Sequence, residues 1–121
     1  MSYVDGYVFT IQKKNLQKYQ KMAKDAGKIW KKYGALSYME CVGDDLKPMM
    51  GMLPFRKLTK AKPNEIVLYS FIVYKTKADR NRINKKIMKE MEEQYGKQDH
   101  KDMPFDLKKM AFGGFKSIVD L

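Results

Sequence analysis

The feature of this sequence that most constrains its fold is the order in which the hydrophobic period changes along the chain. Residues 3–11 carry apolar side chains on alternate positions, as a strand does, whereas residues 15–34 carry them at three- and four-residue steps, as a helix does. The same periods predict four further elements: strands at residues 35–43 and 66–74, a helix over residues 76–96 and a last strand within residues 109–119. The predicted order is strand, helix, strand, strand, helix, strand.

Residues that favour helix ends mark both predicted helices. Asn15 is a good N-cap for the first helix, and Gly34 is a good residue at which to end it. Thr76 and Asp79 form a capping box at the start of the second helix, and Gly96 ends it.

This order of elements predicts an α+β fold of the ferredoxin-like βαββαβ type, in which a four-stranded antiparallel sheet carries both helices on one face. A chain of 121 residues has the length of one domain, so residues 1–121 are expected to form a single ferredoxin-like domain. The strands carry apolar side chains on both faces, but two helices cover only one. Either a second subunit or a ligand is therefore expected to cover the open face.

A loop over residues 44–65 separates the predicted second and third strands and carries Pro48, Pro54 and Pro63. A short extended piece is predicted within it at residues 54–58. Loops of this length in small domains are often functional lids or arms.

The composition predicts a basic surface, because 25 Lys and Arg residues outnumber 14 Asp and Glu residues and give a formal net charge of +11. Only Arg56, Arg80 and Arg82 are arginines, and the other basic residues are lysines. Arginine grips phosphate with two hydrogen bonds, whereas lysine serves equally well as a solubilising coat. A nucleic-acid-binding module that uses the lysine-rich surface is therefore kept as the alternative function.

The stretch YSFIVY, residues 69–74, bears on that alternative, because RNA-recognition domains place stacking aromatic residues on the third strand of the same order of elements. Their motif begins with a basic residue and a glycine, where this chain has Val67 and Leu68. No lysine or arginine lies between Ile66 and Tyr74. The stretch is therefore interpreted as a buried wall, and RNA stacking is not expected.

The sequence predicts a cytoplasmic protein. Its longest apolar run is far shorter than the roughly 20 residues of a membrane-spanning helix, and the N-terminal residues do not have the pattern of a secretory signal. Cys41 is the only cysteine, which excludes an intramolecular disulfide and suits a reducing compartment.

Two carboxylates fall among apolar positions of predicted strands. Glu40 shares its strand face with Tyr38, and Asp5 shares its face with Tyr7. Each is either paired with a lysine, a tyrosine hydroxyl or a backbone amide, or is available as an acid or base. Cys41 points to the face opposite Glu40, so the two are not expected to act together.

A small apolar or aromatic ligand would need a pocket between the sheet and the long loop. The residues proposed for this pocket are Asp5, Tyr7, Tyr38, Glu40 and Tyr69. One histidine, His100, and one cysteine do not make a zinc or iron site, so neither a metal nor a cofactor is expected.

Four segments carry a resemblance to a known family: YVDGYVFTI, NLQKYQKMAKDAGKIWKKYGALSYMECVGDD, VLYSFIVYKTKADRNRINKKIM and MPFDLKKMAFGGFKSIVD. They resemble the YbaA-like family of bacterial proteins, domain of unknown function 1428, over essentially the whole chain. The long loop departs from the family, with KPMMGMLPFRKL in place of a Ser/Thr-rich approach to Phe-Pro.

The resemblance implies a dimeric α+β barrel, in which two ferredoxin-like sheets pack face to face, and hence a homodimer through the open sheet face. It implies no established activity. Some families with this barrel are enzymes acting on aromatic or polyketide-like substrates without a cofactor, and others bind haem. Haem is not expected here, because the only histidine lies outside the predicted strands and helices. A small-molecule binder or cofactor-free enzyme with a pocket in the dimeric barrel is the first hypothesis for function.

Overall fold

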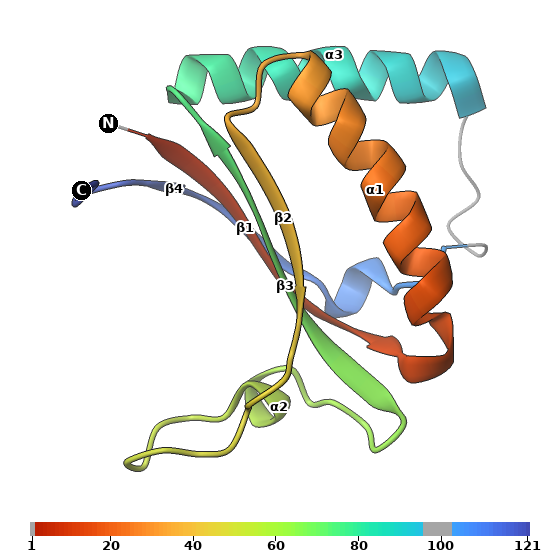
Figure 1. Ribbon diagram of the computed structural model, residues 1–121, viewed down its shortest axis with the longest axis vertical. Helices are drawn as coiled ribbons and strands as arrows, with labels where there is room; N and C mark the ends of the chain where they lie inside the picture. The colour runs from red at the N-terminus through yellow and green to blue at the C-terminus, as the bar shows by residue number, and fades with distance from the viewer. Residues whose placement is uncertain (1, 96–102) are drawn as a thin grey trace.

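The computed structural model describes residues 2–95 and 103–121 (Figure 1). Its four-stranded sheet has the order β2-β3-β1-β4, and all neighbouring strands are antiparallel. The strands are β1 Tyr3–Gln12, β2 Ser37–Val42, β3 Glu65–Tyr74 and β4 Ala111–Lys116. The two central strands, β1 and β3, pair along their full length. The predicted ferredoxin-like α+β fold is confirmed.

Both long helices, α1 Leu16–Lys32 and α3 Lys77–Tyr95, lie on one face of the sheet (Figure 1). A 3-10 turn, η1 Lys13–Asn15, leads into α1, so Asn15 makes no side-chain cap, contrary to its predicted role. Gly34 ends this helix region with φ +113°, a conformation that favours glycine. At α3 the backbone N–H of Asp79 donates to Thr76 Oγ1 at 3.0 Å, as an N-cap requires. Gly96 lies outside the described residues.

Residues 43–64 form an arm that extends from the sheet between β2 and β3 (Figure 1). The extended piece predicted at residues 54–58 is wrong, because Phe55–Leu58 form a short helix, α2. Pro54 has φ −67°, and its carbonyl accepts hydrogen bonds from the backbone N–H groups of Lys57 and Leu58 at 3.1 and 3.0 Å. Proline at the start of a helix loses no intrahelical hydrogen bond, which explains why it begins this turn.

The core on the helix-covered face is divided into two clusters of buried residues. One cluster contains Phe9, Ile11, Tyr19, Ala23 and Leu68. The other contains Ala35, Ile72, Tyr74, Ile83 and Ile87. Figure 1 shows how the two clusters are separated: the C-terminal end of α1 lies next to α3, whereas the N-terminal part of α1 crosses the sheet at a distance from α3.

In the part of the chain that the structure describes, neither long helix lies on the opposite, open face of the sheet. The side chains that alternate onto it include Met39, Tyr69 and Phe115, which are 48%, 47% and 63% exposed. β4 pairs with β1 in a continuous register through Gly113 and Gly114, so neither glycine forms a bulge. Gly114 instead permits a close approach, since a Cβ there would collide with the Tyr3 hydroxyl.

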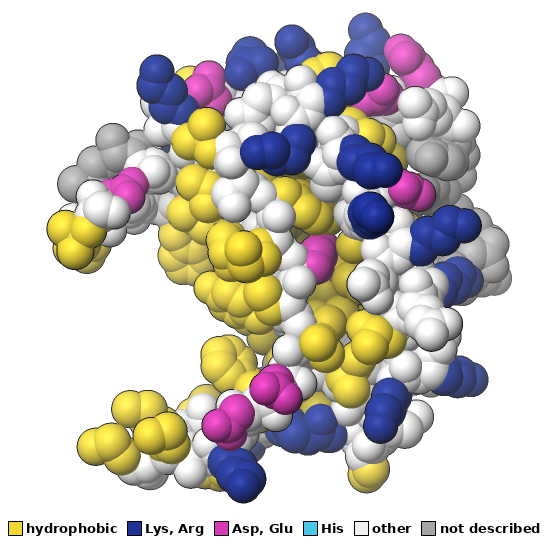
Figure 2. Space-filling model, viewed as in Figure 1, with side chains coloured by type: hydrophobic (Ala, Val, Ile, Leu, Met, Phe, Trp, Pro, Cys, Tyr) yellow, Lys and Arg dark blue, Asp and Glu magenta, His cyan; other side chains and the backbone are white. Residues whose placement is uncertain are grey.

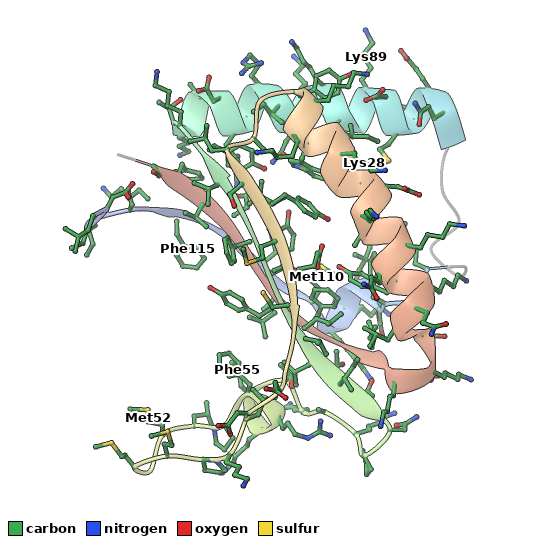
Figure 3. The ribbon with its side chains drawn as sticks, in the orientation of Figure 1. Lys28, Met52, Phe55, Lys89, Met110 and Phe115 are labelled. Atoms are coloured by element: carbon green, nitrogen blue, oxygen red, sulfur yellow. The ribbon has the colours of Figure 1, made fainter. Side chains whose placement is uncertain are left out.

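Figure 2 shows hydrophobic side chains gathered on a hollowed surface between the arm and the C-terminal end of the chain. In Figure 3, Phe115 and Phe55 point into this hollow from β4 and from the arm, whereas Lys28 and Lys89 project from the outer sides of the helices. None of the helices within residues 2–95 and 103–121 combines the length and apolar composition needed to cross a bilayer.

Candidate functional site

A cavity of about 680 Å³ lies on the helix-covered side of the sheet, between the two core clusters. We call it the Glu40 cavity, after the carboxylate in its wall. The sheet, α1, α3 and the segment before β4 all contribute to its lining. Protein interiors rarely leave voids much larger than a water molecule, and pockets for small ligands occupy roughly 300–1,000 Å³. The cavity therefore has the size of a ligand site rather than of a packing defect.

Three hydroxyl groups converge on Glu40 in the cavity wall. Tyr38 donates to Oε1 at 2.8 Å, and Tyr19 donates to Oε2 at 2.8 Å. Ser70 also donates to Oε2. These donors come from β2, α1 and β3, because antiparallel pairing sets Glu40 opposite Ser70 and the helix brings Tyr19 over both. These donors stabilise the half-buried carboxylate, which has no ion-pair partner among residues 2–95 and 103–121.

Burial raises the pKa of the Tyr19 and Tyr38 hydroxyls well above its ordinary value, and the negative charge of Glu40 raises it further. Both hydroxyls thus stay protonated and act as donors at neutral pH. They hold Glu40 in one orientation.

Tyr7 lies beside this group on β1, opposite Ser70 in β3. Burial is the main cause that raises the pKa of its hydroxyl, followed by the charges of Asp5 and Glu40. Its ring packs on Phe112 with the centroids 4.8 Å apart. Within residues 2–95 and 103–121 its hydroxyl has no hydrogen-bond partner. It is a free polar group at the cavity wall.

Asp5 is completely buried and forms an ion pair instead of lining the cavity. Arg80 Nε lies 2.9 and 3.2 Å from its two carboxylate oxygens, and Asn84 Nδ2 donates to it at 3.3 Å. Asn84 Oδ1 in turn accepts from Trp30 Nε1 at 3.2 Å and from the Tyr74 hydroxyl at 3.1 Å. This network joins α1, α3 and the central strands behind the cavity, so Asp5 has a structural partner rather than an exposed acid function.

The structure separates the five residues that were proposed for one pocket. Tyr7, Tyr38 and Glu40 line the cavity, Asp5 lies behind it, and Tyr69 points to the open face. The cavity lies between the sheet and the helices, whereas the sequence placed a pocket between the sheet and the long loop.

Cys41 is half-buried on the open face beside Tyr69, on the side opposite Glu40. The candidate thiol and the candidate carboxylate therefore do not share a site. His100, the only histidine of the chain, lies outside the described residues.

Sequence reasoning did not include Tyr19, Ser70, Trp30 and Asn84 among the residues of the site. Ser70 carried a signal, because it is the only serine or threonine among residues 66–74. It pairs with Tyr7 of β1 in the sheet. Tyr19 and Trp30 carried only the helical spacing of core residues. Among residues 2–95 and 103–121 there is no group of three His, Cys, Asp or Glu side chains placed to hold a metal ion.

A family model described as "Protein of unknown function (DUF1428)" matches residues 2–107. The chain belongs to this family. It is 38% identical over 121 residues to the "Uncharacterized protein YbaA" of Escherichia coli strain K12, with 99% of each chain covered. The protein of the same name from Shigella flexneri gives the same identity and coverage. The predicted membership of the YbaA-like family is confirmed, and this DUF1428 family has no established activity.

A solved structure shares the fold at 10% sequence identity, with a TM-score of 0.58 over the full length of both chains. It is described as a dimeric ferredoxin-like protein from an uncultured marine organism. At this identity the likeness concerns the fold of the DUF1428 chain, not its activity.

Proposed function

We propose that this protein binds a small, largely apolar organic molecule in the Glu40 cavity. The observation that carries the proposal is a cavity of about 680 Å³ whose walls are mostly apolar and in which three hydroxyl groups converge on the Glu40 carboxylate. Ligand sites typically combine apolar walls with a few placed polar groups that fix orientation.

Methionine side chains make up much of the apolar wall and suit it to a ligand of irregular shape. They are Met22, Met88, Met91, Met103 and Met110; Met39 also belongs to the lining, but its side chain alternates onto the open face. Unbranched thioethers adapt their rotamers to the molecule that they contact. Met110 lies between the sheet and α1 in Figure 3, next to the first core cluster.

The fluorescence of Trp30 can report ligand binding, because Trp30 is the only tryptophan of the chain and it lines the cavity. We expect a neutral apolar dye, Nile red, to bind saturably and to quench Trp30 fluorescence. Replacement of Ala26, a small residue in the α1 wall, by phenylalanine should fill space in the cavity and weaken dye binding about tenfold or more.

The matched control is Gln20→Phe, which adds the same ring to an exposed position of α1 that is not part of the cavity lining. This control should bind dye as the unchanged protein does. Equal binding by both variants would contradict the proposed site, and an absence of saturable binding to the unchanged protein would contradict the proposed function.

We also propose that two copies pair through the open sheet face to form a dimeric α+β barrel. The support is an apolar, hollowed surface with half-exposed Met39 and Tyr69 and a strongly exposed Phe115 (Figure 2). A face of this kind is usually covered in a soluble assembly. The related fold described as dimeric gives the same indication. Light scattering over a range of protein concentrations should give twice the mass of one chain.

A further inference from the structure

The charge of the Glu40 cavity is opposite to the charge of the chain. The chain has a formal net charge of +11. Among the described residues that line the cavity, Asp25, Glu40 and Glu92 are acidic and none is basic. The lysines of α1 and α3 instead project outward, as Lys28 and Lys89 do in Figure 3.

From this contrast we infer that the ligand of the cavity is an organic cation, a protonated amine or quaternary ammonium group attached to an apolar body. The inference rests on the proposed function and adds the chemical class of the ligand. A cation would meet a fixed negative charge inside an apolar wall, where electrostatic interactions are less screened than in water.

The hydrogen bonds of Glu40 leave room for a further donor. Oε2 accepts from both Tyr19 and Ser70, whereas among the described residues Oε1 accepts only from Tyr38. A carboxylate has about four lone-pair positions, so one remains on Oε1. The free Tyr7 hydroxyl at the same wall is a second acceptor for an ammonium N–H.

Aromatic rings line the cavity wall near Glu40 and favour a cation as well. Tyr38 and Trp30 pack with their ring centroids 5.8 Å apart, and Tyr7 and Tyr19 complete the group that lines the cavity. The faces of such rings attract ammonium groups, which is the way that quaternary ammonium ligands are recognised. An apolar body would then lie against the methionine wall.

The two other carboxylates belong to exposed residues of the lining, Asp25 on α1 and Glu92 on α3. They add two negative charges to the solvent-exposed part of the lining. Such charges mainly speed the approach of an oppositely charged ligand and repel a like-charged one. A carboxylate ligand is therefore disfavoured both at this exposed part and at Glu40.

The test uses three probes of equal length that differ only in the charge of one end: phenylbutylamine, phenylbutanol and phenylbutyrate. Each is titrated against the full chain at neutral pH with Trp30 fluorescence as the readout. We expect the amine to bind about tenfold or more tightly than the alcohol, because its hydrogen bond to Glu40 is charge-assisted. The carboxylate should bind weakest.

Glu40→Gln keeps the size of the side chain and removes its charge. In this variant the preference for the amine over the alcohol should disappear. Glu93→Gln, an exposed change on α3 outside the cavity lining, is the matched control and should keep the preference. If Glu40→Gln does not fold, the Asp25→Asn, Glu92→Gln double variant gives the second test. In the double variant we expect the preference for the amine over the alcohol to be reduced at low salt.

The outcomes separate this inference from the proposed function. If the alcohol binds as tightly as the amine, or the carboxylate binds tightest, the cavity still binds ligands but the inference is overturned. An unchanged amine preference in folded Glu40→Gln also overturns it. If none of the three probes binds, the inference fails, and the absence of dye binding as well would remove the proposed function with it.

Discussion

Gly27 in α1 lies where the ring of Tyr38 packs against the helix. A Cβ at this position would lie 2.6 Å from Tyr38 Cδ1 and 2.7 Å from Cε1. Because the clash involves the near side of a ring that also donates to Glu40, Tyr38 would have to move. Helix propensity alone would favour alanine over glycine, by about 1 kcal/mol.

We therefore predict that Gly27→Ala lowers the free energy of unfolding by about 1–3 kcal/mol, the usual cost of overpacking. Urea unfolding followed by circular dichroism measures it. Lys28→Ala, an exposed change in the same turn, should stay within about 0.5 kcal/mol of the unchanged protein. A more stable Gly27→Ala variant would show that Tyr38 is not held against α1.

The tyrosines around Glu40 predict a distinctive alkaline titration. Burial, and then the charge of Glu40, hold the pKa of Tyr19 and Tyr38 above the ordinary value of 10.0. Because the pKa is raised in the folded state, the stability that these hydroxyls contribute is complete below pH 10 and is lost as the pH rises above it. Tyrosinate absorbance should show them ionising after the exposed tyrosines.

Glu40→Gln should bring the ionisation of both tyrosines to lower pH without abolishing the delay, since burial is the larger cause. Ser70→Ala, which removes a neutral donor from the same group, keeps the charge and should leave most of the delay in place. Titration of Tyr19 and Tyr38 together with the exposed tyrosines in the unchanged protein would contradict the geometry.

At the scale of single residues, strand alternation predicted which side chains share a face of the sheet, but the hydrogen-bond partners of the site were seen only in the structure. Alternation placed Glu40 with Tyr38, and Asp5 with Tyr7, on the faces where the structure has them. The partners of these carboxylates depend on strand register and helix rotation, which a periodic pattern does not contain. For that reason the hydrogen bonds from Tyr19 and Ser70 to Glu40 were not predicted.

Among the elements, the arm is attached to the sheet by a few polar contacts at its base. Arg56 donates to the carbonyl oxygens of Glu65 and Lys62 at 2.9 and 2.8 Å. Glu65 accepts from the backbone N–H of Lys62 at 2.8 Å and lies 3.8 Å from Lys109 Nζ. These contacts join the end of the arm to the first residue of β3.

The hydrogen bond from Lys62 is the main reason that the pKa of Glu65 lies below its ordinary value of 4.5. A lowered pKa means that Glu65 stabilises the fold above its ordinary pKa and that this stability is lost as the pH falls through the lower folded value. We predict that Glu65→Gln is less stable than the unchanged protein at neutral pH and that the difference disappears in acid.

Thermal melts at a series of pH values between neutral and strongly acidic measure this difference. Glu93→Gln, an exposed glutamate on α3, is the control and should melt with the unchanged protein at each pH. A stability difference for Glu65→Gln that does not depend on pH would show that its charge has no part in holding the arm.

The order and most of the boundaries of the long elements could be predicted, because each spans several repeats of its hydrophobic period. The short helix α2 could not, since four residues are about one turn and contain no full repeat. Residues 54–58 were predicted to be extended, although proline, here Pro54, is also favoured where a helix begins. Short elements set by a single residue are therefore where the sequence was least informative.

At the scale of the whole molecule, the position of the cavity depends on how two helices cross the sheet. Each helix has an apolar side that faces the sheet, and the sequence predicts this. The divergence of α1 from α3, which leaves the space between the two core clusters, does not follow from either helix alone (Figure 1). Sequence reasoning accordingly proposed a pocket between the sheet and the long loop instead.

Pairing of two copies through the open face leads to the last prediction. Phe115 is 63% exposed and points into the hollow from β4 (Figure 3). Phe115→Lys would place a charge where an apolar surface is expected to be buried, so we predict that it weakens the dimer about tenfold or more. Light scattering over a dilution series measures the change as a fall in mass toward a single chain.

Met88→Lys is the matched control, because Met88 is also strongly exposed but lies on α3, away from the open face. It adds the same charge and should leave the mass unchanged. A dimer that loses mass equally in both variants would be responding to net charge, and a dimer unaffected by Phe115→Lys would have its interface elsewhere.

If the unchanged protein is a monomer at every concentration, the aromatic residues of β3 are open to solvent. Oligonucleotide titration at several salt concentrations would then test the alternative function, since binding to phosphates weakens steeply with salt.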